Sequence, residues 1–169
     1  ALVVTNRRSP GTQVSDQTIE LHAASRASEI LGDDGHVNIV SYYRKVLLTG
    51  EVPTEEARQR LQVAVAETPE VAGVINELAV MPATSLSTRS NDTVVNAKGV
   101  PSNSIKVVTE RGSTYLMGRV TRQEADLATE AARTTSGVQR VVRVFDFISE
   151  AEARRVDGSS GRSSQLQAP

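Results

Sequence analysis

The residues best suited to chemistry in this chain of 169 residues are two tyrosines followed directly by two cations. Tyr42, Tyr43, Arg44 and Lys45 fall where we expect a turn between two strands. Amphipathic rings at the level of lipid headgroups, with cations for the phosphates, make a physically sound interfacial contact. We therefore take these four as candidate lipid-binding residues. Two other interpretations stay open, namely an ordinary solvated turn and a Tyr42 that packs between two domains.

A second candidate patch consists of Ser90, Asn91, Asp92 and Thr93. We favour Asp92 as a helix N-cap that accepts backbone N–H bonds, because an acid would repel anionic headgroups. An exposed helix N-terminus beside Asn91 and Thr93 can also hold a phosphate through its backbone amides. Asn91 and Thr93 therefore join the candidate lipid-binding residues.

Other chemistries find little support. The two histidines are His22 and His36, there is no cysteine, and no Asp, Glu and His residues have the spacing of metal ligands. Neither a nucleophile elbow nor a glycine-rich phosphate loop occurs. We therefore expect no catalytic residues, no metal site and no cofactor. A net charge of −1, without a basic stripe interleaved with aromatics, argues against nucleic acid as a partner.

The charge is unevenly spread along the chain. Residues 12–80 carry 5 basic and 11 acidic side chains, net −6, whereas residues 81–148 carry 9 basic and 6 acidic, net +3. Such a difference can orient two domains on a charged surface, although undirected drift of surface charge explains it equally well. No apolar run approaches the ~20 residues that span a bilayer.

The elements that must position these residues occur twice. Residues 46–52 and 114–120 align at an offset of 68 residues, and the closing segments that begin at Val71 and Val138 align at 67. One single-residue gap superposes the two copies, so the pattern indicates a duplicated structural unit. With only 3 tyrosines, 2 phenylalanines and no tryptophan, each core must be small and aliphatic.

The order of elements in a copy is helix, strand, strand, helix, strand. In the first copy, Ser15 or Asp16 is expected to cap the first helix and Thr54 the second. In the second copy, Thr121 and Glu124 form a capping box before an alanine-rich helix. Alternating apolar residues predict the strands.

The second copy has little room for its first helix. Asp92 and Ile105 are 13 residues apart, and glycine, proline and serine occupy much of the interval. This helix is therefore expected to be short or missing, or residues are absent between Thr93 and Val94.

The predicted fold is α+β, with two tandem αββαβ units that each contain a three-stranded mixed sheet packed on helices. The expected boundaries are a flexible tether at residues 1–11, unit one at 12–80, a linker at 81–89, unit two at 90–148, and an extension with a disordered tail at 149–169.

This order of elements resembles the BON domain (the bacterial OsmY and nodulation family) over about residues 11–148. The resemblance rests on the strand sequences of residues 46–52 and 114–120 and on the closing segments of residues 71–76 and 136–141. Two such domains behind residues 11–16 are similar to the dual-BON lipoproteins of the proteobacterial outer membrane.

The resemblance implies a periplasmic protein attached to the outer membrane through an acylated N-terminal cysteine. Its implied role is non-enzymatic, peripheral binding of anionic phospholipid that supports outer-membrane integrity. This sequence differs in lacking the lipidated cysteine, as expected if it starts downstream of it, and in its short or missing membrane-contacting helix. The alternative is a protein–protein adaptor that regulates envelope or cell-wall assembly partners.

Overall fold

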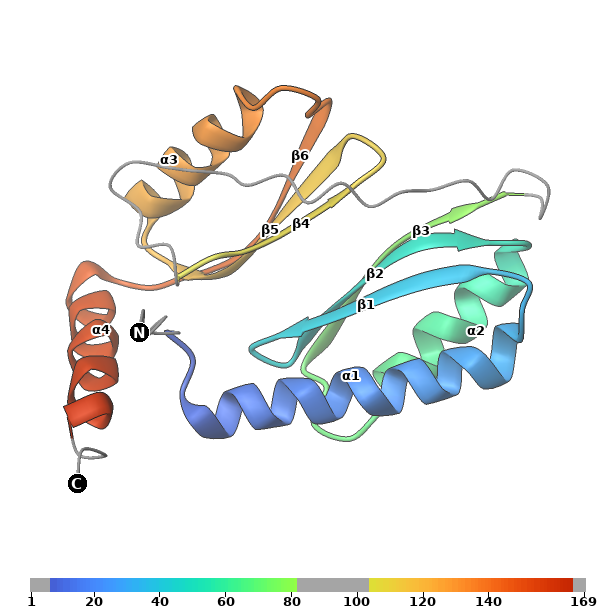
Figure 1. Cartoon of the computed structure of the whole chain (residues 1–169), viewed down its shortest axis with the longest axis horizontal. Coiled ribbons are helices and arrows are strands. Elements are labelled where there is room, and N and C mark those ends of the chain that lie inside the picture. Colours follow the sequence, from blue (N-terminus) through green and yellow to red (C-terminus); the bar gives the residue numbers. More distant parts are fainter. Residues whose placement is uncertain (1–6, 82–103, 166–169) are drawn as a thin grey trace. The chain divides into compact units, whose positions relative to one another are not determined.

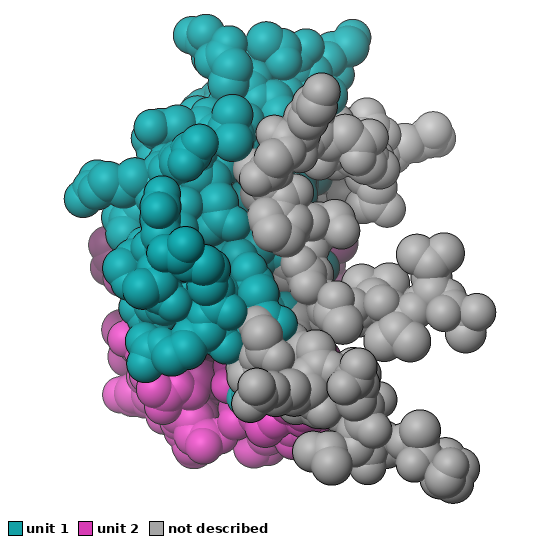
Figure 2. Space-filling view, turned by 90° about the vertical axis from the view of Figure 1, so that its left-hand side faces the viewer, with its two compact units in different colours: residues 1–9, 90–169 teal, residues 10–89 magenta. Residues whose placement is uncertain are grey.

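The computed structural model describes residues 7–81 and 104–165, with side chains as far as Asp157. The chain divides into two compact units, shown in Figure 2 in magenta and teal. The N-terminal unit is Pro10–Arg89, and the C-terminal unit combines Ala1–Ser9 with Ser90–Pro169. Each unit has its own sheet, and we describe the two separately.

The N-terminal unit has a three-stranded mixed sheet covered by two helices (Figure 1). Its elements are α1 (Pro10–Leu31), β1 (His36–Tyr42), β2 (Lys45–Val52), α2 (Glu55–Ala66) and β3 (Gly73–Val80). Strand β2 is central, antiparallel to β1 and parallel to β3. The parallel pair requires a crossover, which α2 supplies.

The core of this unit lies between the sheet and one face of α1 and α2. The residues of this core recur on α1 at helical spacing and on β2 at alternating positions, although β2 is buried on both faces from Val46 to Val52. The buried residues of this core are Ile19, Ala23, Ala27, Leu31, Val46, Leu48, Val52, Leu61, Val65 and Leu78.

The C-terminal unit repeats this arrangement from its first strand onward. Its elements are β4 (Lys106–Glu110), β5 (Ser113–Val120), α3 (Arg122–Arg133), β6 (Arg140–Phe147) and α4 (Glu150–Gln165). Strand β5 is central, antiparallel to β4 and parallel to β6. Within residues 104–165, no helix precedes β4. The predicted α+β fold with two mixed sheets is confirmed.

Two glycines occupy equivalent places in the central strands. Gly50 and Gly118 have φ of +119° and +149°, and a Cβ at either would collide with the carbonyl oxygen of His36 or Ser104. Only glycine permits this close backbone approach. The two sites are as far apart in the chain as the predicted repeat.

Some boundaries differ from the predicted ones. Helix α1 starts at Pro10, inside the predicted tether, because proline is well suited to the first turn of a helix. Helix α4 continues to Gln165, through Gly158 and Gly161, where we expected a disordered tail. Strand β6 starts at Arg140, after a turn in which the Val138 amide bonds to Thr135. The predicted linker falls almost wholly outside the described residues.

Arg7 connects the segment before α1 to the C-terminal unit. Its side chain is 1% exposed. It donates to both carboxylate oxygens of Asp157 at 2.9 and 3.1 Å, and to those of Glu124 at 3.1 and 3.3 Å. A further bond reaches the Arg119 carbonyl at 2.8 Å. This part of the predicted tether therefore belongs to a folded core.

Glu124 serves two partners at once. Besides binding Arg7, it accepts a bond from the Thr121 amide at 2.9 Å and completes the predicted capping box of α3. Burial would raise the pKa of Glu124, but the hydrogen bonds from Arg7 and Thr121 outweigh burial and lower it. Because the pKa of Glu124 is lowered in the folded state, the ionised carboxylate stabilises the unit at pH values above the unfolded-state pKa of this group. That stability is lost as the pH falls through the folded pKa.

We expect Arg7→Met to destabilise the C-terminal unit at pH 7 by roughly 1–3 kcal/mol, because the nearly buried Glu124 carboxylate loses its cation. The difference from wild type should shrink at an acidic pH that lies below the lowered folded-state pKa of Glu124, where this carboxylate is protonated. Urea unfolding followed through NMR signals of β5 measures this unit alone.

The control is Arg154→Met, which removes an exposed guanidinium from α4 of the same unit. It should change stability by no more than about 0.5 kcal/mol. An Arg7→Met penalty that is absent at pH 7, or equally large at both pH values, contradicts the assigned ion pair.

Candidate functional site

The predicted turn at residues 42–45 is a two-residue hairpin loop with unusual backbone angles. Tyr42 pairs with Lys45, and between them Tyr43 and Arg44 have φ of 52° and 63°. Two successive positive φ values define a type I′ turn, which matches the twist of the flanking strands. The left-handed region costs an ordinary side chain about 1–2 kcal/mol per residue, so this loop needs external support.

Asp16 of α1 supplies that support. Its side chain is buried and accepts bonds from the Tyr43 amide at 3.0 Å, the Arg44 amide at 2.7 Å and the Ser41 hydroxyl at 2.8 Å. Our expectation that Ser15 or Asp16 caps α1 was wrong, because the helix begins earlier and Asp16 lies inside it. The carboxylate satisfies the amides of the turn instead.

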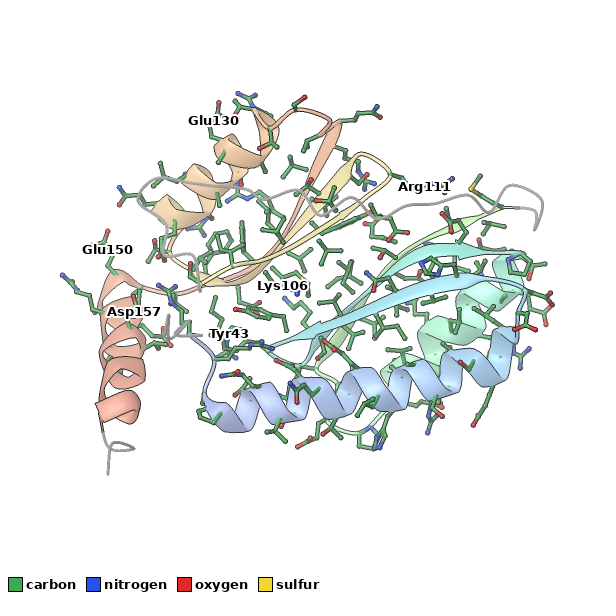
Figure 3. The ribbon with its side chains drawn as sticks, viewed as in Figure 1. Tyr43, Lys106, Arg111, Glu130, Glu150 and Asp157 are labelled. Atoms are coloured by element: carbon green, nitrogen blue, oxygen red, sulfur yellow. The ribbon has the colours of Figure 1, made fainter. Side chains whose placement is uncertain are left out.

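The four predicted lipid-binding residues of the turn do not share one environment. Arg44 is exposed, Tyr43 and Lys45 are half-buried, and Tyr42 is only 6% exposed. The two rings meet edge to face, with centroids 5.1 Å apart. Figure 3 shows Tyr43 at the hairpin tip, beside the first turns of α1. The structure therefore presents one exposed cation, one half-buried cation and one half-buried ring here. Asn91 and Thr93 lie outside the described residues.

The C-terminal unit carries a second group, which sequence reasoning did not assemble. Phe147 is 45% exposed, with the guanidinium of Arg122 4.5 Å from its ring centroid and that of Arg143 5.9 Å from it. Arg143 also lies 5.8 Å from the Phe145 ring and 3.4 Å from the Asp126 carboxylate. We call Arg122, Arg143, Phe145 and Phe147 the Phe147 cluster. Such cation–aromatic pairs contribute about 0.5–1 kcal/mol at exposed sites.

A sequence signal for part of this cluster existed. Arg143, Phe145 and Phe147 alternate along β6 and must share one face of the sheet. Arg122 belongs to the first turn of α3 and reaches the same face only in the folded unit. The alternation could have been found from the sequence, whereas the Arg122 contact could not.

No group of three or more His, Cys, Asp or Glu side chains is placed to hold a metal among the described residues. His22 and His36 are both exposed, one on α1 and one at the start of β1. None of the described helices has the length and apolar character needed to cross a membrane.

These features define a tandem repeat of small α+β domains. A model of the BON domain matches residues 20–82 and again residues 83–148. The chain therefore belongs to the BON-domain family, and the predicted duplication corresponds to its two BON domains.

Two relatives align with most of the chain. The outer membrane lipoprotein DolP of Haemophilus influenzae is 34% identical over 88% of this chain and 82% of the relative. The 21 kDa hemolysin of Actinobacillus pleuropneumoniae is 32% identical over 83% of this chain and 78% of the relative. Among solved structures, the type III secretion protein CdsD of Chlamydia trachomatis aligns with a TM-score of only 0.27 at 10% identity, over 86% of this chain and 98% of CdsD.

We expect Arg44→Gly to stabilise the N-terminal unit by about 1 kcal/mol, because glycine adopts the required positive φ without a steric cost. The matched variant Arg60→Gly changes the same residue type within α2 and should destabilise the unit by about 1 kcal/mol. Urea unfolding followed through NMR signals of β2 tests both. Destabilisation by Arg44→Gly would show that the arginine side chain itself holds the turn.

Proposed function

We propose that this protein binds anionic phospholipid peripherally, without catalysis, at the periplasmic face of the Gram-negative outer membrane, and so supports envelope integrity. The observation that carries the proposal is the Phe147 cluster. A half-exposed ring flanked by two guanidinium groups suits the boundary between headgroup phosphates and acyl chains. The position of this cluster in the chain is consistent with binding to anionic lipid, because residues 81–148 carry a net charge of +3.

The hairpin tip of the N-terminal unit is the second proposed contact. Arg44 is exposed and its backbone is fixed by Asp16, so a headgroup phosphate would meet a cation that is already in place. Tyr43 and Lys45 are proposed to support it, whereas Tyr42 is too deeply buried to enter an interface. Asn91 and Thr93 remain part of the proposal on sequence grounds alone.

Similarity to an outer-membrane lipoprotein supports the proposed location. One acyl chain gives only marginal membrane binding, so a lipidated protein of this kind needs a second, weaker contact from its folded part. A tether also raises the local concentration of that contact, which therefore need not be strong alone.

Vesicle flotation of the full chain tests the lipid proposal. Binding to phosphatidylcholine vesicles that contain phosphatidylglycerol should exceed binding to phosphatidylcholine alone, and should weaken as salt is raised. We expect Arg122→Glu with Arg143→Glu to reduce binding by about thirtyfold, since the two lost cations are together worth about 2 kcal/mol near an anionic surface. The control, Arg154→Glu with Arg155→Glu, makes the same charge change on exposed residues of α4. Equal, negligible binding to both vesicles rejects the proposed function.

The hairpin tip is tested by Arg44→Glu with Lys45→Glu. We expect a reduction of several-fold in binding to phosphatidylglycerol vesicles, because two cations near the surface become two anions. The matched control is Arg26→Glu with Arg60→Glu, two exposed residues on α1 and α2. If both double variants lose vesicle binding equally, only the net charge of the unit matters. The hairpin tip is then not part of the lipid-binding site.

A further inference from the structure

A groove with a volume of about 640 Å³ runs through the N-terminal unit between α1 and β1. Figure 1 shows the blue helix lying alongside this strand. Six apolar residues line it: Leu21, Ala24, Ala27, Leu31, Val37 and Ile39. Leu21 is 72% exposed at its rim and extends the apolar surface of the groove.

One wall of the groove is the edge of a sheet. The strand order is β1-β2-β3, so β1 pairs with β2 on one side only. In the hairpin, Tyr42 and Lys45 flank a two-residue loop and form a hydrogen-bonded pair, after which bonded and non-bonded pairs alternate. Ser41, Ile39 and Val37 therefore direct their N–H and C=O groups away from β2 and toward the groove.

Helix α1 accepts a hydrogen bond from the outward backbone groups of this edge at one end only. Glu20 accepts a bond from the outward Ser41 amide at 3.0 Å, which confirms the alternation just described. In the part of the chain that the structure describes, no bond of this kind reaches the amides of Val37 and Ile39. The edge thus offers the donors and acceptors of two residues, and Glu20 marks where any added ladder must stop.

The charges around the groove indicate which class of ligand it can bind. Its ionisable lining residues are Glu20 and His36, and exposed Asp33 and Asp34 follow in the connection from α1 to β1. These carboxylates make the groove acidic, in contrast to the hairpin tip of the same unit, which presents Arg44. The groove therefore repels anionic lipid, and the same edge of a second copy would bring like charges together. A basic strand meets no such penalty.

We propose that this groove binds an extended segment of a partner protein by β-strand addition. The segment pairs with Val37 and Ile39 at the edge of the sheet. Its alternate apolar side chains lie between α1 and β1, and its basic side chains face Glu20, Asp33 and Asp34. Backbone bonds supply affinity in this mode of recognition, and the groove supplies selectivity. The proposal is independent of lipid binding.

The test uses the full chain and phage-displayed random peptides of about eight residues, a typical strand length. Enriched peptides should alternate apolar with polar or basic residues. A synthetic peptide of the most enriched sequence should slow amide hydrogen exchange at Val37 and Ile39. Ser28→Arg places a bulky cation in the groove and should weaken binding of this peptide, raising its Kd by about tenfold or more. Ser25→Arg, the same change on the same helix outside the groove, should leave the Kd within about twofold.

Each alternative result overturns the proposal. No enrichment on wild type over the Ser28→Arg protein excludes a peptide site here, as does a peptide that binds both proteins equally. A wild-type dimer that Ser28→Arg converts to monomer assigns the groove to a second copy. Phosphatidylglycerol vesicles that protect the same two amides assign it to lipid. If the Ser28→Arg variant floats with phosphatidylglycerol vesicles as wild type does, the substitution leaves lipid binding intact. The peptide site and the lipid function are then tested separately.

Discussion

The pairing of each central strand with one antiparallel and one parallel neighbour organises both units. An antiparallel neighbour can follow through a tight turn, but a parallel one requires the chain to leave the sheet and return. Helices α2 and α3 are those returns, and each covers the sheet that it crosses. The cores stay small because these sheets are narrow and their side chains are mostly aliphatic. A hairpin tip at one end and an open strand at one side then follow from the topology.

The two units differ in what they add to this shared frame. In the N-terminal unit, α1 supports a strained turn through Asp16 and flanks the edge of β1. In the C-terminal unit, one of the two left-handed positions of the equivalent turn is a glycine, Gly112, and cations gather around Phe147. One unit is acidic and the other is basic along the residues considered above. The duplicated frame therefore supports two different surfaces, which the proposals assign to two classes of partner.

Local and periodic features of this fold were predictable, and contacts between distant residues were not. The strands and the capping box of α3 depend on near neighbours, and the repeat depends on a fixed offset along the chain. All three were correctly predicted. Asp16 was taken for a helix cap because its true partner is a turn 27 residues away. Arg7 binds Asp157 across 150 residues, and no pattern links them. Arg122 and Phe147 meet only because a helix and a strand pack. In each missed case the signal lies in tertiary geometry.

The ion pair of Arg7 makes the C-terminal unit a product of both ends of the chain. During synthesis the N-terminal BON domain can form from contiguous residues, since domains fold as the ribosome releases them. The second BON domain also has its sheet and its crossover helix within a contiguous stretch, residues 106–147. The contact between Arg7 and Asp157 is different, because it closes a loop of 150 residues, and closing so long a loop is costly in entropy. A fragment that lacks the segment of Arg7 would keep every strand of this unit and yet leave the Glu124 carboxylate without its cation.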